Sequence, residues 1–70
     1  MPGSQEKANA IARRIILRVP DSHGVTSLTG DIAHAIRADG GSHRDTINAL
    51  IDVGLAVDWA EADELLAEIY

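Results

Sequence analysis

The chain has 70 residues, enough for one domain around one small core, and 46% of them are apolar although only one Trp and one Tyr are aromatic. It contains no cysteine, which excludes a disulfide framework and a thiolate metal site. No stretch reaches the roughly 20 apolar residues that span a membrane, and no cationic segment followed by an apolar core indicates a signal peptide. We therefore expect a cytoplasmic protein without membrane contact.

The net charge of −5 is unevenly distributed along the chain. Residues 1–44 hold all six cations against four acids, whereas residues 45–70 hold seven acids and no cation. This asymmetry indicates either two faces with different partners or an acidic helix surface that is simply solvated.

The first predicted element is a helix over residues 5–19, where apolar side chains recur at helical spacing. Ser4 is its expected cap, and Pro20 ends it because the residue before a proline avoids the α region. Residues 1–4 are expected to be a disordered lead-in. The competing interpretation is a strand over residues 13–19, RRIILRV, which is rich in β-branched residues. The helix is preferred because it accounts for more of the sequence.

A turn, PDSHG, and a short extended stretch are predicted to precede a second helix over residues 28–38. Asp31 is expected in the first turn of this helix, where it would favour the helix dipole. Asp39-Gly40-Gly41 then supplies a C-cap and a tight turn.

The third helix, residues 43–54, has the clearest start signal in the chain. Ser42 and Asp45 form a capping box of the Ser-x-x-acid type, and Gly54 is expected to end the helix. A last helix over residues 58–69 is predicted to be capped by Asp58, with Glu61 completing a second capping box. The predicted fold is thus a single all-α domain over residues 1–70, made of four short helices with a helix-turn-helix core.

Neither catalysis nor a cofactor is expected. His23, His34 and His43 are separated by 11 and 9 residues, which is not metal-ligand spacing. The two Ser-His neighbours in the sequence do not provide the geometry of a catalytic triad. The glycine turn before Ser42 resembles an anion-binding nest, with an ordinary turn as the alternative.

The remaining candidate site is the predicted helix-turn-helix, formed by the second and third helices of the chain. The third helix carries polar side chains on faces that the core does not use, and side chains of these types contact phosphates and base edges in DNA complexes. The alternative is an ordinary helical hairpin with a polar outer face. The predicted DNA-binding residues are Arg14, Arg18, Arg37, Ser42, His43, Arg44, Thr46 and Asn48.

Two resemblances also suggest DNA. Residues 28–57 resemble the helix-turn-helix core of winged-helix and related bacterial regulators, on Asp31-Ile32-Ala33 followed by Ile47, Leu50, Val53, Gly54 and Leu55. This resemblance implies a transcriptional regulator or accessory factor whose third helix, starting at His43, reads DNA.

Residues 14–57 are also similar to ribbon-helix-helix repressors and plasmid relaxosome accessory proteins. The matching residues are Leu17-Arg18-Val19-Pro20, Gly40-x-Ser42, Ile47, Leu50-Ile51 and Gly54-Leu55. This similarity implies a dimer built on a strand at residues 13–19, with Arg14, Ile16 and Arg18 facing the major groove. The amides near Ser42 and His43 would then hold a phosphate.

The negative net charge of the chain argues against DNA binding, since DNA-binding proteins are usually basic, and it suggests a function of a different class. The alternative is a helical protein-interaction module, of adaptor, antitoxin-like or phage-encoded type, that forms a homodimer or binds a protein partner. Its predicted interface is the C-terminal helix, used as a docking or dimer surface, with aromatic residues of the kind enriched at interfaces. In the fold itself, the residues that can form the buried face of this helix are Trp59, Ala62, Leu65, Leu66, Ile69 and Tyr70. The predicted interface residues are Trp59, Leu66, Ile69 and Tyr70.

Overall fold

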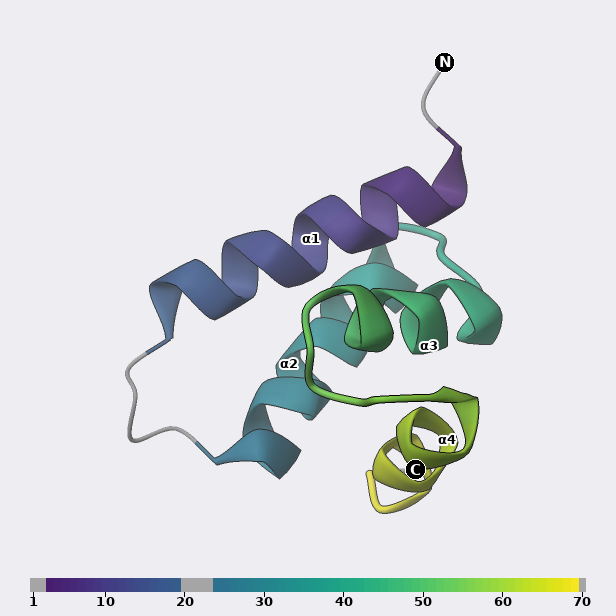
Figure 1. The fold of residues 1–70 in the computed structure, drawn as a ribbon. Coiled ribbons are helices and arrows are strands. Elements are labelled where there is room, and N and C mark those ends of the chain that lie inside the picture. Colours follow the sequence, from purple (N-terminus) through teal and green to yellow (C-terminus); the bar gives the residue numbers. More distant parts are fainter. Residues whose placement is uncertain (1–2, 20–23, 70) are drawn as a thin grey trace.

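The computed structural model describes residues 3–19 and 24–69, and these residues form four α-helices and no strand (Figure 1). The helices are α1 (Ser4–Arg18), α2 (Val25–Ala38), α3 (His43–Asp52) and α4 (Trp59–Ala67). The predicted all-α class is confirmed. The alternative strand over residues 13–19 is wrong, because residues 13–18 belong to α1, where Ile11 and Ile15 pack against the core at helical spacing.

α1 begins one residue earlier than predicted. Its N-cap is Gly3, without a side-chain cap, and Ser4 is already helical, so Ser4 is neither the cap nor part of a lead-in. Contacts with α3 hold this first turn, since Gln5 Nε2 donates to the carbonyl of Asp45 at 3.0 Å. At the other end Val19 is extended, as a residue before proline should be.

α2 begins three residues earlier than predicted, at Val25, and the expected extended stretch over residues 25–27 is wrong. The N–H of Leu28 donates to the carbonyl of Gly24 at 3.0 Å, which closes the first turn. The earlier start leaves Asp31 beyond the first turn, which holds no acid. No capping side chain marks this start, because the N-cap is Gly24.

α2 and α3 end in the same way. After each helix a glycine takes a left-handed conformation, Gly40 with φ 87° and Gly54 with φ 82°. The following residue then donates to a carbonyl five positions back: Gly41 to Ile36 at 2.9 Å and Leu55 to Leu50 at 3.0 Å. These are Schellman motifs, which satisfy the last carbonyl groups of a helix. The predicted glycine stops are therefore confirmed, with α3 ending at Asp52 rather than at residue 54.

α4 is capped by Asp58, whose Oδ1 accepts from the N–H of Glu61 at 2.9 Å, as predicted. The predicted second capping box is only half formed, because among the described residues the Glu61 side chain does not bond back to the N–H of Asp58. Its buried residues are Ala62 and Leu66. The expectation that Trp59 lies on the buried face is wrong, because this side chain is 47% exposed. The helix ends at Ala67, and Tyr70 lies outside the described residues.

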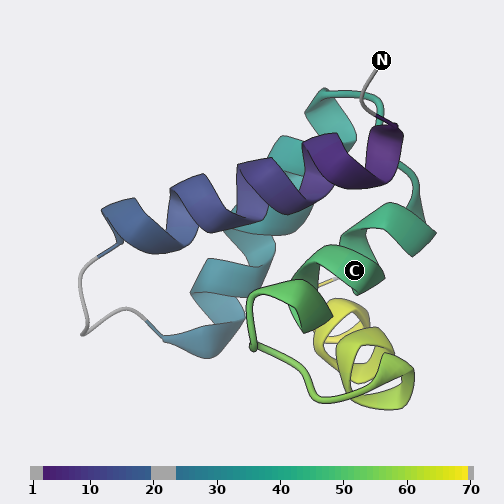
Figure 2. The ribbon, with the colours of Figure 1, turned by 45° about the horizontal axis from the view of Figure 1, so that its top comes forward.

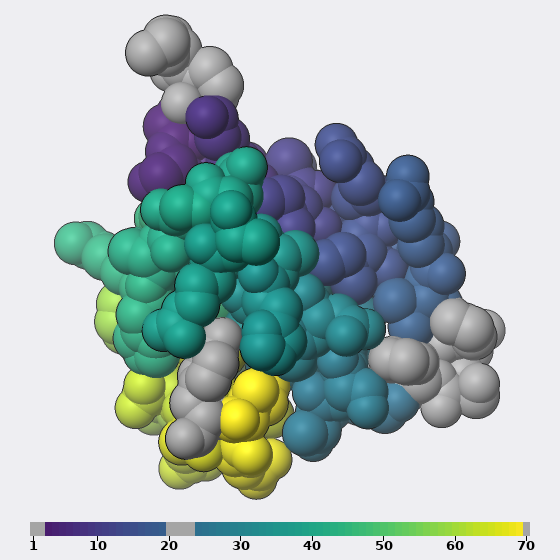
Figure 3. All heavy atoms as spheres, turned by 180° about the vertical axis from the view of Figure 1, so that it is seen from behind, coloured from purple at the N-terminus to yellow at the C-terminus, as the bar shows by residue number. Residues whose placement is uncertain are grey.

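The four helices form three layers. α2 and α3 each pack against every other helix, whereas α1 and α4 lie on opposite sides of this pair (Figures 1 and 2). From behind, α2 and its turn to α3 separate α1 from the end of α4 (Figure 3). Six of the eleven buried apolar residues are alanines, which lets the helix axes approach closely. No helix in the described ranges is long and apolar enough to cross a membrane.

Candidate interaction surface

The predicted capping box at the start of α3 is present. Ser42 Oγ accepts from the N–H of Asp45 at 3.1 Å, and Asp45 Oδ2 accepts from the N–H of Ser42 at the same distance. The Ser42 N–H holds the pKa of Asp45 below its ordinary value, and the Ser4 hydroxyl lowers it further. The chain's own carboxylate therefore occupies the place where a helix N-terminus would hold an external anion.

The glycine turn before α3 is not an anion-binding nest. The N–H of Gly40 donates to the carbonyl of Arg37 at 3.0 Å, and the N–H of Gly41 to that of Ile36. The N–H of Ser42 is used by Asp45. The Schellman motif and the capping box thus engage the three N–H groups of residues 40–42, which is the arrangement of an ordinary turn rather than of a nest.

Two of the predicted DNA-binding residues on α3 face inward. Thr46 is 6% exposed, and its hydroxyl donates to the carbonyl of Ser42 at 3.1 Å. Asn48 is half-buried: its Nδ2 donates to Gln5 Oε1 at 2.9 Å, and its Oδ1 accepts from Trp59 Nε1 at 3.1 Å. The expectation that Thr46 and Asn48 lie on free outer faces is wrong, because neighbouring helices cover more of α3 than its apolar stripe indicates.

His43 and Arg44 are exposed in the first turn of α3. The Nε2 of His43 lies 3.2 Å from Asp63 Oδ1 on α4, so an acidic helix borders this end of α3. Ser42 is exposed as well, but its hydroxyl and its N–H both serve the cap. Arg37 is exposed in the last turn of α2, just before the glycine turn.

Arg18 lies far from that turn. α1 and α3 run in the same general direction, since Gln5 contacts the start of α3 and Arg13 contacts its end at Asp52. At about 1.5 Å of rise per residue, Arg18 lies roughly 20 Å along α1 from Gln5. Arg14 lies between these two ends and lines a hollow with Ala38 and Asp39. The predicted DNA-binding residues are therefore spread along α1 as well as around the turn, rather than gathered in one patch.

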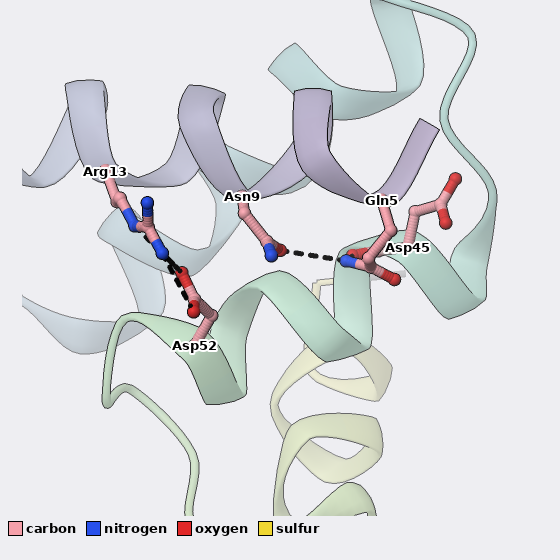
Figure 4. Close-up of polar contacts among 5 residues, drawn as sticks. All are labelled: Gln5, Asn9, Arg13, Asp45 and Asp52. Atoms are coloured by element: carbon pink, nitrogen blue, oxygen red, sulfur yellow. Dashed lines mark hydrogen bonds and ion pairs between the residues drawn. The ribbon is translucent and has the colours of Figure 1, made fainter. Parts of the chain in front are cut away.

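A row of polar contacts joins α1 to α3 (Figure 4). Gln5 donates to Asn9 Oδ1 at 2.9 Å as well as to the Asp45 carbonyl. At the other end Arg13 forms a two-pronged ion pair with Asp52, at 3.0 Å from Nε and 3.1 Å from one terminal nitrogen. These contacts were not predicted, although polar residues spaced by four along α1 are a signal for them in the sequence.

An apolar surface lies where α1 and α3 end. Leu17 is 86% exposed, and it lines a hollow of about 320 Å³ together with Ile16, Val53 and the Arg13–Asp52 ion pair. We call these residues the Leu17 surface. This surface was not predicted as a site. Its signal in the sequence is that Leu17 lies outside the apolar helical stripe of α1, where an apolar side chain is expected to be exposed.

The predicted interface on α4 is largely unavailable. Leu66 is 1% exposed, so its role as a contact residue is wrong: it packs in the core. Ile69 is half-buried, and its Cδ1 lies 3.9 Å from the position a Cβ on Gly30 would take. Trp59 remains accessible, and the neighbouring Val57 is 79% exposed.

Within residues 3–19 and 24–69, no group of three or more His, Cys, Asp or Glu side chains is arranged to hold a metal ion. His23 lies outside these ranges. Comparison of the chain with models of protein families, with curated proteins and with solved structures finds no match. The functional assignment therefore depends on the geometry of the chain itself.

Proposed function

We propose that this chain is a small helical protein-interaction module that binds an acidic partner through the Leu17 surface. The observation that carries the proposal is the exposure of Leu17 beside a preformed hollow lined by Ile16 and Val53. Burying a leucine side chain contributes roughly 1.5–3 kcal/mol. A partner that covers Leu17 gains this energy without a rearrangement of α1 or α3.

The charges around Leu17 favour an acidic partner. The last two turns of α1 hold three arginines and no acid. Asp52 is paired with Arg13, and Arg14 shares a hollow with Asp39, so Arg18 is the cation beside Leu17 that these two acids do not balance. This is the cationic end of a chain whose net charge is −5. Complementary charge speeds encounter with an acidic partner and disfavours a basic one.

The surroundings of α3 support binding of protein in preference to DNA. A recognition helix needs several polar side chains free to enter the major groove. Thr46 and Asn48 are instead engaged inside the fold, and the acidic α4 borders His43. Any DNA placed along α3 would meet the carboxylate of Asp63 as well as the exposed Arg44.

DNA binding by a regulator or accessory factor is a second candidate, favoured by one observation: His43 and Arg44 are exposed at the capped start of α3, after a helix and a tight turn. Under this candidate Arg44, Arg14 and Arg18 contact phosphates. Arg44→Ala should then weaken DNA binding in a mobility-shift assay and reduce the salt slope by about one phosphate contact. No shift on any DNA at low salt would remove this candidate.

The protein-interaction proposal is tested by selecting displayed peptides on the immobilised full chain. Wild type should enrich acidic sequences with apolar anchors, and Leu17→Asp should lose them. Ala10→Asp is the matched control, because Ala10 is exposed on the same outer side of α1 two turns earlier, outside the hollow. Selection of no peptides, or equal selection by Leu17→Asp, would contradict the proposal.

A further inference from the structure

The chain carries a second exposed apolar surface, of opposite charge to the Leu17 surface. Val57 and Trp59 are two of the four large apolar residues exposed in the described part of the chain, and the exposed acids Asp58 and Glu61 lie beside them in the sequence. We call these four residues the acidic edge. Residues 45–70 hold no lysine or arginine, so no neighbouring cation in this segment neutralises it.

The acidic edge is held in place rather than loose. Trp59 Nε1 donates to Asn48 Oδ1 at 3.1 Å, and Asp58 caps α4 through the N–H of Glu61 at 2.9 Å. The indole is therefore oriented before any contact forms, with part of its ring open to solvent. A preformed anchor reduces the entropy lost on binding.

The two surfaces match each other in both apolar character and charge. Resting on the proposed function, we infer that the acidic partner is a second copy of this chain, whose acidic edge docks on the Leu17 surface. The side chain of Val57 or Trp59 enters the hollow beside Leu17, which measures about 320 Å³. Asp58 and Glu61 then face the arginines of α1. This arrangement places the cationic end of one acidic chain on the acidic end of the next.

The arrangement is head-to-tail. The last turn of α1 and the first turn of α4 lie on opposite sides of the α2–α3 pair (Figures 1 and 2), so one pairing of copies leaves one surface of each kind open. Such a heterologous contact continues to further copies instead of stopping at a symmetric dimer. The predicted homodimer through the C-terminal helix is replaced here by a chain of copies.

Sedimentation velocity on the full chain tests the inference. The contact is small, so association should become visible only towards about 1 mM protein, and it should weaken as salt rises from about 0.05 M to about 0.5 M. Leu17→Asp removes one surface and Val57→Lys removes the other, and each variant alone should sediment as a monomer. Mixed in equal amounts, they should form a one-to-one dimer, because each retains the surface that the other has lost.

Helix content by circular dichroism shows that each variant folds, and Ala10→Asp should associate as wild type does. The inference is overturned if wild type remains a monomer at all concentrations. It is also overturned if wild type stops at a dimer that the mixture of variants does not restore. If wild type remains a monomer while selected peptides still bind through Leu17, the inference fails and the proposed function stands. If wild type neither self-associates nor selects peptides through Leu17, the inference and the proposed function both fail.

Discussion

The same substitution should change the stability of this chain in opposite directions at two glycines. Gly30 lies inside α2, and a Cβ there would meet Ile69 Cδ1 at 3.9 Å, an ordinary van der Waals distance. Gly41 lies in the turn before α3, and a Cβ there would overlap Ile36 Cγ2 and lie 3.1 Å from the carbonyl oxygen of Ile36. Gly30→Ala is therefore expected to stabilise the fold and Gly41→Ala to destabilise it.

The magnitudes follow from the two environments. Alanine is favoured over glycine in a helix interior by roughly 0.5–1 kcal/mol, and Gly30→Ala gains this amount because space is available. Ile36 is buried, and its carbonyl already accepts from the N–H of Gly41 at 2.9 Å. Ile36 therefore cannot move aside without losing core packing or this hydrogen bond. Overpacking of this kind costs about 1–3 kcal/mol, which sets the expected loss for Gly41→Ala.

Thermal unfolding followed by circular dichroism measures both effects. In a domain of this size 1 kcal/mol shifts Tm by about 4–8 °C, so Gly30→Ala should raise Tm by about 2–8 °C and Gly41→Ala should lower it by at least about 4 °C. Urea unfolding should give the same order of stability. A loss of stability in Gly30→Ala, or an unchanged Tm in Gly41→Ala, would refute this account of the packing.

Three further predictions concern buried and capping groups. Ser42→Ala removes the acceptor of the Asp45 N–H and should lower the free energy of unfolding by about 1 kcal/mol in urea titrations. The folded pKa of Asp45 is below its unfolded value of about 3.9, so its contribution is complete at neutral pH and is lost on acidification. Asp45→Asn should therefore flatten the fall of Tm with pH below about pH 4. Thr29 is fully buried, and its hydroxyl has no hydrogen-bond partner among residues 3–19 and 24–69. Thr29→Val should therefore raise the free energy of unfolding by about 1 kcal/mol, and a lower value would show that the hydroxyl does have a partner.

The sequence predicts the fold well because its signals are local. Gly40 and Gly54 mark the Schellman stops, and the spacing of Ser42 and Asp45 marks the capping box. The early start of α2 is missed because no capping side chain marks it, and packing of the helix against its neighbours decides where it begins.

The candidate site is less predictable, because exposure depends on which helices cover which face. The apolar stripe of α3 gives one buried side, but it does not indicate that Asn48 lies between Gln5 and Trp59. Likewise the sequence is compatible with Leu66 as a core residue or as an interface residue, and only the position of α4 shows that it lies in the core. Leu17 was visible as an apolar residue outside the stripe, but its hollow needs Val53 from another helix.

A protein partner is expected to bind where α1 and α3 end. An NMR titration of the ¹⁵N-labelled full chain with a selected acidic peptide locates this contact residue by residue. Amide shift changes should gather at Ile16, Leu17 and Val53. Changes gathered instead at His43 and Arg44, or no changes at all, would contradict it.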